Sequence, residues 1–231
     1  MQTDQELFAR GLATYRRVIA ENYMAHQEVY RLLRRVLETE APDEFVFLDL
    51  ACGTAAGSAD ALKDTRIGRY IGIDISQPSL DVARQALTGL NCPVDLRCQD
   101  FVAAISTWTE PIDVVWIGQS LHHLATPLEK RDLMRRVQQL IPRRGFFMIW
   151  EPTCLDNEDR QGWLEHFRRL RAEWSILTDE EFAAFDVHCT ASDYPETAAT
   201  WISLGREAGF ERCEELLVVP NGLARVYRYS H

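Results

Sequence analysis

The chain has 231 residues, 46% of them hydrophobic, which is enough for one globular domain with a sizeable core. Its formal net charge is −10, from 35 acidic and 25 basic residues. Such a surface repels the phosphates of nucleic acids unless basic residues gather on one face. The arginine clusters fall mostly in predicted helices among carboxylates, where they indicate a solvated surface rather than a nucleic-acid site.

The amino-terminal sequence MQTDQELFAR lacks the basic and apolar regions of a signal peptide, and no run of 18 apolar residues could span a membrane. The six cysteines are scattered without a C-x-x-C pair, which disfavours a structural zinc site and indicates reduced thiols. We therefore expect a cytoplasmic protein with no membrane partner. The sequence leaves open whether it forms a homodimer.

Apolar residues at helical spacing predict two helices over residues 4–38, after which short apolar runs alternate with helical segments. Ser76 and Thr126 suit the N-cap positions of two helices. Strands separated by helices in this way are typical of βαβ units in a parallel sheet buried on both faces. The predicted strands are FVFLDL (45–50), RYIGID (69–74), VDLRCQ (94–99), IDVVWIG (112–118) and GFFMIWE (145–151), with helices near 55–63, 76–89, 101–107 and 127–140.

Beyond residue 151 the pattern becomes helical: large apolar residues recur over 158–187, the sequence ASDYPET follows as a loop, and a further helix covers 196–208. The chain ends in two predicted strands, CEELLVV and LARVYRY, joined by the turn sequence PNG. The predicted fold is therefore α/β, a doubly wound, mostly parallel, seven-stranded sheet with an antiparallel C-terminal hairpin. Its parts within a single domain (1–231) are N-terminal helices (1–40), a core (41–151), a helical cap with a loop (152–210) and the hairpin (211–231).

The stretch FLDLACGTAAGSAD (47–60) continues in small residues from a predicted strand into a predicted helix. Such a strand–turn–helix suits a ligand that lies against bare backbone at a helix N-terminus, although a tight turn without a ligand would also use small residues. A nicotinamide dinucleotide is one candidate. Its G-x-G-x-x-G fingerprint is missing, since the nearest match is Ala51-x-Gly53-x-x-Ala56.

Acidic residues recur at the ends of the first three predicted strands: Asp49 ends the first, Asp74 ends the second and Asp100 follows the third. The carboxyl ends of neighbouring strands line one crevice in a doubly wound sheet, so we expect three carboxylates there. They suit a ligand with positive charge and sugar hydroxyls better than a pyrophosphate. Asp74 would accept both hydroxyls of a ribose, Asp100 with Phe101 would contact an adenine ring, and Asp49 would hold an ammonium group.

Residues 45–151 resemble the class I S-adenosylmethionine-dependent methyltransferases. LDLACGTA is similar to the first motif of that family, GIDIS to its acidic ribose motif, CQDF to its adenine motif, IDVVWIGQSLHHL to its fourth-strand motif, and EAGF to the sequence before its sixth strand. Ala51 and Ala55 stand where the family has glycines, which narrows the space beside a ligand. The resemblance implies a Rossmann-like enzyme whose core (41–151) binds S-adenosyl-L-methionine under an N-terminal lid (1–40). The residues that it implies for the cofactor are Asp49, Ala51, Cys52, Gly53, Asp74, Ile75, Asp100, Phe101 and Gly118.

Methyl transfer from a sulfonium needs acceptor, methyl group and sulfur in line, and often a base for the acceptor proton. Residues after the fourth strand face the methyl group in this family, which makes His122 and His123 the candidate catalytic residues, as base or as hydrogen-bond donor. Alternatively, both histidines have structural roles: one caps the next helix and the other packs against neighbouring side chains. Adjacent side chains usually point apart, so we expect only one to act directly. We expect no metal site, because nothing supplies further ligands at useful spacing.

The other predictions concern the acceptor pocket, which insertions usually build in this family. Glu151 either orients a basic acceptor or caps the next turn. The aromatic residues of the first helices either form a lid over the cofactor or pack in a core. Aromatic residues along one face of a helix more often do the latter. The residues predicted to bind the acceptor are Tyr23, His26, Gln119, Glu151, His188 and Tyr194.

The sequence thus predicts methyl transfer to an oxygen, nitrogen or sulfur atom of a small-molecule acceptor, with nucleic acid disfavoured as a partner by the acidic surface. Three alternatives remain: a non-catalytic regulatory protein that keeps the cofactor fold, a methyltransferase acting on tRNA or protein, and a nicotinamide-linked oxidoreductase.

Overall fold

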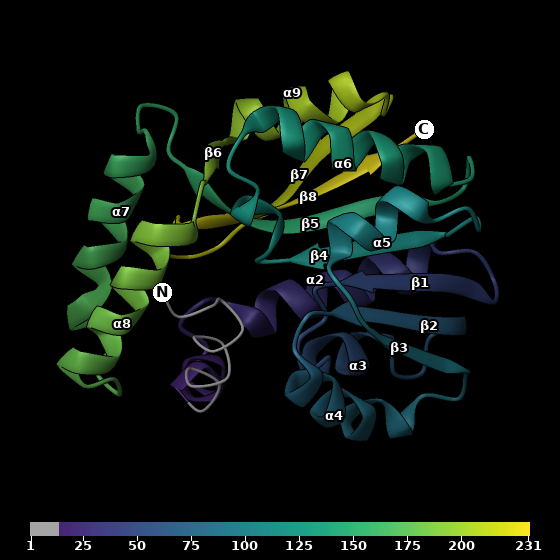
Figure 1. Ribbon diagram of the computed structural model, residues 1–231, viewed down its shortest axis with the longest axis horizontal. Coiled ribbons are helices and arrows are strands. Elements are labelled where there is room, and N and C mark those ends of the chain that lie inside the picture. The colour runs from purple at the N-terminus through teal and green to yellow at the C-terminus, as the bar shows by residue number, and fades with distance from the viewer. Residues whose placement is uncertain (1–13) are drawn as a thin grey trace.

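The five apolar runs between residues 45 and 151 form parallel strands side by side in the computed structural model, which describes residues 14–231 (Figure 1). Each strand lies within two residues of its predicted start, and the last one extends three residues further than predicted. The start of the first predicted helix, residues 4–13, lies outside the described residues. The strands are β1 (Phe45–Leu50), β2 (Ile67–Asp74), β3 (Val94–Cys98), β4 (Val114–Gly118) and β5 (Phe146–Cys154).

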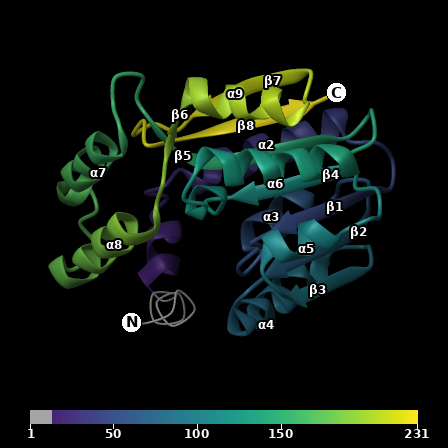
Figure 2. The ribbon, with the colours of Figure 1, turned by 45° about the horizontal axis from the view of Figure 1, so that its top comes forward.

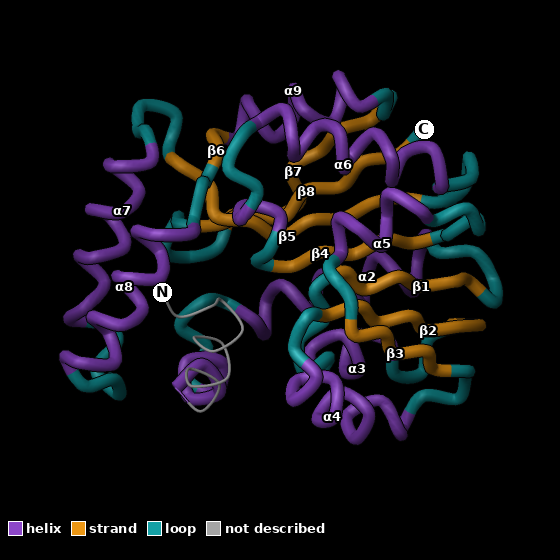
Figure 3. The backbone as a smooth tube through the Cα atoms, in the orientation of Figure 1, coloured by secondary structure: helices purple, strands orange, loops and turns teal. Residues whose placement is uncertain are grey.

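The sheet of the described chain has the order β3-β2-β1-β4-β5-β8-β7, with the short strand β6 beside β5 (Figure 3). The predicted terminal hairpin is confirmed: β8 (Ala224–Ser230) runs antiparallel to both β5 and β7 (Arg212–Val218). The predicted α/β fold with a mostly parallel sheet is confirmed as well. The sheet has eight strands rather than seven, because β6 (Glu196–Thr197) pairs with the extension of β5.

Helices cover both faces of the sheet because every central strand is apolar on both sides. Leu48 and Leu50 pack toward α5, α6 and α9, whereas Phe45 and Phe47 pack toward α2, α3 and α4. The predicted caps form: the hydroxyls of Ser76 and Thr126 accept backbone N–H groups of α4 and α6. The helices are α2 (His26–Glu40), α3 (Ala56–Leu62), α4 (Gln77–Ala86), α5 (Phe101–Thr107), α6 (Pro127–Leu140) and α9 (Ala198–Ala208).

A helical cap, α7 (Arg160–Arg169) and α8 (Asp179–Ser192), stands beside the carboxyl ends of the strands, apart from the helices that cover the sheet (Figure 2). It has its own core, in which Phe167 stacks on Phe182 with ring centroids 5.1 Å apart. Val18, from the helical residues 14–20, joins this core. The large apolar residues of 158–187 are therefore the inside of the cap. No helix within residues 14–231 is long and apolar enough to cross a membrane.

Candidate active site

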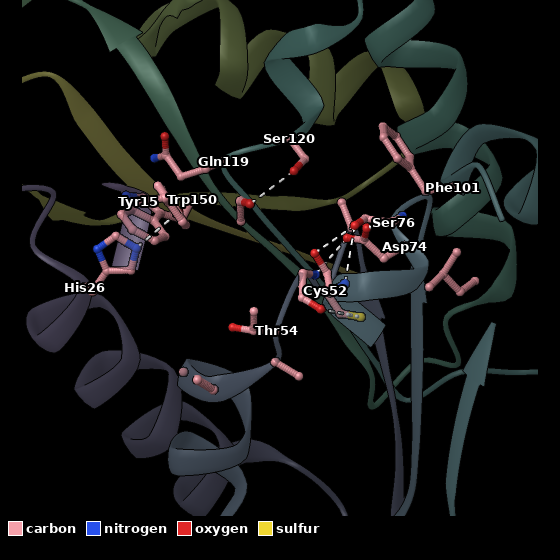
Figure 4. A pocket seen from close by; sticks show the side chains of 18 of the residues that line it. Tyr15, His26, Cys52, Thr54, Asp74, Ser76, Phe101, Gln119, Ser120 and Trp150 are labelled. Atoms are coloured by element: carbon pink, nitrogen blue, oxygen red, sulfur yellow. Dashed lines mark hydrogen bonds between the residues drawn. The ribbon is translucent and has the colours of Figure 1, made fainter. Parts of the chain in front are cut away.

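A cavity of about 700 Å³ opens where β1, β2 and β4 end, and α2 and the cap close its other side. Its two ends differ in chemistry. Asp74, Ser76 and Phe101 lie at one end, and His26, Gln119 and Trp150 lie at the other (Figure 4). Eight of the nine residues predicted for the cofactor line this cavity: Ala51, Cys52, Gly53, Asp74, Ile75, Asp100, Phe101 and Gly118.

The turn between β1 and α3 holds three residues in the left-handed region: Ala51 at φ 54°, Gly53 at φ 53° and Ala55 at φ 52°. Alanine pays about 1–2 kcal/mol for this conformation, whereas glycine does not. The two alanines that replace family glycines therefore adopt the glycine conformation all the same. As a result, small side chains and backbone groups, rather than bulky side chains, face the cavity here.

The carboxylate of Asp74 is the main acidic group of this end of the cavity. One oxygen accepts the N–H of Gly53 at 2.7 Å and the other accepts the N–H of Ser76 at 2.8 Å. Burial raises the pKa of Asp74, and these two hydrogen bonds act in the opposite direction. Asp100 is occupied as the N-cap of α5, where it accepts the N–H of Ala103 at 2.8 Å.

Asp49 is the ninth predicted cofactor residue, and it does not line the cavity. The side chains of a strand alternate between its faces, so Asp49 points to the same side as Phe47, beneath the turn. It is only 2% exposed, and it accepts the hydroxyl of Tyr70 at 2.8 Å. The sequence placed three acids at one rim, whereas the structure brings Asp74 and Asp100 there and keeps Asp49 below.

Burial raises the pKa of Asp49 from 3.8 to about 7, although hydrogen bonds with Ser58 and Tyr70 act in the opposite direction. Between these values the folded protein keeps a proton that the unfolded chain has lost, so the free energy of unfolding falls as the pH rises through this window. We expect the wild type to lose about 1 kcal/mol relative to Asp49→Asn between about pH 6 and 7, measured by urea unfolding. The same pH dependence in both proteins would contradict the raised pKa.

His122 and Glu151 form a buried ion pair behind the cavity. His122 Nδ1 lies 2.6 Å from Glu151 Oε2, and His122 Nε2 lies 3.3 Å from Asp193 Oδ1. Burial alone would lower the pKa of His122, but the charges of Asp193 and Glu151 raise it to about 9. The ring is therefore a buried imidazolium that does not line the cavity, so we assign His122 a supporting role instead of the predicted direct one.

His123, the last residue of the short 3-10 helix Leu121–His123, lines the cavity. The two histidines do not point apart as expected for adjacent residues, because their ring centroids lie only 4.2 Å from each other. His123 Nδ1 lies 3.1 Å from the carbonyl oxygen of Ser192. A carbonyl only accepts, so Nδ1 carries the proton and Nε2 keeps a free lone pair. Burial and then the positive charge of His122 lower the pKa of His123 to about 4. His123 is thus a neutral base at physiological pH.

Of the residues predicted for the acceptor, His26, Gln119 and His188 line the cavity, whereas Tyr23, Glu151 and Tyr194 do not. Tyr23 packs in the core of the cap, where its ring stacks on that of Trp174 with centroids 5.3 Å apart. Core packing was the alternative to a lid over the cofactor that the sequence left open for this aromatic residue. Tyr194 lies under the guanidinium of Arg160, which is 4.7 Å from the ring centroid. Both aromatic residues therefore hold the cap in place.

Trp150 is a lining residue that the sequence interpretation missed. It precedes Glu151 on β5, and strand alternation could have placed it on the opposite face, toward α2. Its ring meets His26 edge-on, with centroids 4.8 Å apart, and the hydroxyl of Tyr15 lies 3.3 Å from His26 Nε2. The buried atoms His26 Nδ1, Gln119 Nε2 and Trp150 Nε1 have no hydrogen-bond partner among residues 14–231, so this end of the cavity offers polar groups to a ligand.

Residues 47–145 match the model of a protein family described as a methyltransferase domain. No curated protein matches the sequence.

Several solved structures share the fold. An O-methyltransferase family protein from Burkholderia thailandensis gives a TM-score of 0.68 at 16% identity, over 99% of this chain and 63% of that chain. The methyltransferase in a complex with the Haloferax volcanii Trm112 methyltransferase activator gives 0.66 at 12% identity, over 99% and 98%. The S-adenosylmethionine-dependent methyltransferase SibL in its apo form gives 0.65 at 19% identity, over 100% and 63%. This chain spans between 56% and 66% of the length of five matching structures.

Proposed function

We propose that this chain is a class I S-adenosylmethionine-dependent methyltransferase, and that it transfers a methyl group from S-adenosylmethionine to an oxygen, nitrogen or sulfur atom of a small-molecule acceptor. The observation that carries this proposal is the division of one cavity into an acidic and aromatic end beside Asp74 and Phe101 and a histidine end beside His26 and Gln119, with His123 also in the lining (Figure 4). A cofactor and an acceptor would meet between these ends.

The residues of the acidic end fit the adenosine part of the cofactor. Each oxygen of Asp74 already accepts one backbone N–H, which leaves lone pairs for the two hydroxyls of a ribose. Phe101 would contact the adenine ring. Gly53 and Gly118 also line the cavity, and the absence of side chains at these positions suits the methionine part. S-adenosylmethionine supplies the reactive methyl group on its sulfonium.

At the other end, His123 would act on the acceptor. Its Nε2 is free to take the proton of the acceptor heteroatom, while the carbonyl of Ser192 fixes the ring through Nδ1. The cap would exclude water and align the acceptor with the methyl group. Gln119 and His26 would orient the acceptor through their polar atoms that have no partner in the described part of the chain.

A small acceptor is favoured over a macromolecule by the cavity and the charge. The cap and α2 enclose the histidine end, and the net charge of −10 opposes the approach of RNA. A tRNA substrate would reveal itself through binding that weakens steeply with salt. The cytoplasmic location and the homodimer considered above stay predictions from the sequence.

The proposal is tested first by calorimetric titration of the protein with S-adenosylmethionine, S-adenosylhomocysteine and NAD. We expect the first two to bind and NAD to fail. A screen of metabolite extracts with labelled methyl donor should then identify the acceptor. Binding of NAD instead would favour the oxidoreductase, whereas cofactor binding without any labelled product, together with a co-purifying protein, would favour the regulatory alternative.

Replacing Asp74 with alanine should weaken the affinity for S-adenosylhomocysteine by more than tenfold, about 1.4 kcal/mol, because it removes charge-assisted hydrogen bonds to the ribose. Calorimetry gives the affinity, and circular dichroism checks that the turn around Gly53 survives. Asp81→Ala is the matched control: it removes an equal charge from α4, outside the lining of the cavity. An affinity that hardly changes in Asp74→Ala would show that the ribose lies elsewhere.

A further inference from the structure

Four side chains converge where the 3-10 helix after β4 meets the end of α8. The distances to Asp193 Oδ1 are 3.3 Å from His122 Nε2, 3.6 Å from His123 Nδ1 and 3.7 Å from His188 Nε2. We propose that these residues form a binding site for a divalent transition-metal ion, with zinc as the natural occupant. Among the described residues, His122, His123 and Asp193 also have ligand atoms that all lie within 4.8 Å of one another.

The distances of the three imidazole nitrogens from Asp193 Oδ1 suit a tetrahedral ion, and a shift of the His188 side chain, which lies outside the tighter group of His122, His123 and Asp193, would complete the set. Zinc binds imidazole nitrogen and carboxylate oxygen at about 2.0–2.2 Å, which places neighbouring ligand atoms about 3.3–3.5 Å apart. The separations around Asp193 Oδ1 lie within a few tenths of an ångström of this range. Imidazole with a carboxylate is also a donor set that zinc accepts readily.

The oxygen at the centre of the cluster lacks a hydrogen-bond partner among the residues that the structure describes. Asp193 is 5% exposed, and its Oδ1 makes no hydrogen bond of acceptable geometry although three imidazole nitrogens surround it. Buried carboxylate oxygens are normally satisfied. Asp193 Oδ1 is close to three imidazole nitrogens without being aligned for a hydrogen bond with any of them. This arrangement is expected if the oxygen and the nitrogens all bind one metal ion.

Glu151 supplies the outer contact that histidine ligands usually have. Its Oε2 binds His122 Nδ1 at 2.6 Å, so that His122 Nε2 is directed toward Asp193. Metal-bound histidines typically donate their second N–H to a carboxylate in this way. Glu151 and Asp193 together carry two buried negative charges, and a divalent ion with neutral imidazoles would balance them.

The segment that carries Asp193 is held rigidly from three sides. Tyr194 N–H donates to the carbonyl of His122 at 3.0 Å, Lys130 Nζ donates to the carbonyl of Tyr194 at 2.6 Å, and Arg160 Nε donates to the carbonyl of Asp193 at 2.6 Å. The ligand positions are therefore fixed by the fold, which lowers the cost of assembling a site. The sequence interpretation excluded a metal because spacing alone could not bring residues 188 and 193 to residues 122 and 123.

The ion would also affect the proposed reaction, and this part rests on the proposed function. His123 and His188 line the cavity, so the ion would border the acceptor end. Ligation through Nδ1 would move the ring proton of His123 to Nε2. The loaded protein would then offer the acceptor a hydrogen-bond donor, in place of the base of the metal-free protein, beside the positive charge of a fully coordinated ion, which suits an acceptor whose oxygen or sulfur is already anionic.

The test titrates untagged, chelator-treated full-length protein with Zn²⁺ and Co²⁺ by calorimetry, with the visible spectrum of Co²⁺ as the report on coordination. We expect one equivalent of each ion and the intense absorption of four-coordinate Co²⁺. Asp193→Asn and His188→Gln should each weaken binding at least a hundredfold, in line with the loss of one ligand. Cys98→Ser, which removes an exposed thiol, should change nothing.

The opposite results overturn the proposal. These are no binding in the wild type, full binding in Asp193→Asn, or a loss of binding in Cys98→Ser. His188→Gln guards against misfolding of Asp193→Asn, because it changes a partly exposed side chain, and near-ultraviolet circular dichroism checks both variants. Affinity for S-adenosylhomocysteine is measured in parallel on metal-free protein, so that failure of the metal site leaves the proposed methyltransferase function to be judged separately.

Discussion

Replacing His123 with alanine is expected to slow methyl transfer by about 10²–10⁴-fold, the usual contribution of general acid–base catalysis, while leaving the affinity for S-adenosylhomocysteine nearly unchanged. The reason is its position. His123 lines the cavity on the side of the cap, where its Nδ1 meets the carbonyl of Ser192 and Nε2 keeps its lone pair, and it is not among the residues proposed for the cofactor. Single-turnover transfer of a labelled methyl group, on metal-free protein and with the acceptor identified in extracts, measures the effect.

The matched control is His166→Ala, which removes an imidazole from α7, outside the lining of the cavity. It should retain wild-type turnover. Equal losses of turnover and of cofactor affinity in His123→Ala would place this histidine in cofactor binding or folding and contradict its role as a base.

The pH dependence gives a second check on the same residue. Burial and the charge of His122 lower the pKa of His123 to about 4, so Nε2 is already unprotonated throughout the neutral range. Turnover should therefore stay level between about pH 8 and 6, where an ordinary histidine, with a pKa near 6.5, would become protonated and lose activity. A decline of turnover with a midpoint near pH 6.5 would show that the His123 ring is not desolvated, in contradiction to the structure.

Local signals predicted most of the fold. The helix over Phe101–Thr107 begins and ends at the predicted residues, and Ser76 and Thr126 cap helices as expected, since capping depends on groups within one turn. The loop ASDYPET was placed less well. Residues 191 and 192 continue α8, and Thr197, instead of lying inside the next helix, accepts the N–H of Thr200 as its N-cap.

The positions of site residues were predicted correctly where they depend only on the end of a strand. They were missed where the fold brings together segments that are far apart in the sequence. The residues after β2, β3 and β4 all reach the cavity, because parallel strands end at one edge. Asp49 differs because its side chain leaves the strand one residue before the turn, on the face of Phe47. The meeting of His122 with Asp193 depends on the path of the cap, which no local pattern specifies.

Replacing Glu151 with glutamine is expected to lower the free energy of unfolding by about 3–5 kcal/mol, the range seen when one partner of a buried ion pair is removed. Glu151 is fully buried, and its two oxygens accept the backbone N–H groups of Ser120 at 3.2 Å, Leu121 at 2.9 Å and His122 at 3.2 Å, besides the His122 ring. An amide has only one oxygen to accept, and its nitrogen would face donors. Chemical denaturation measures the loss.

Glu165→Gln on α7 is the control for the same chemical change at an exposed position, and it should stay within about 0.5 kcal/mol of the wild type. A double-mutant cycle with His122→Ala then separates the ion pair from the backbone contacts. We expect a coupling energy of about 1–3 kcal/mol, because either single change removes the short contact between the two charges and leaves the remaining one buried with fewer partners. Additive losses would mean that Glu151 stabilises the turn through its backbone hydrogen bonds alone. In that case the orientation of His122 toward Asp193 would need another cause.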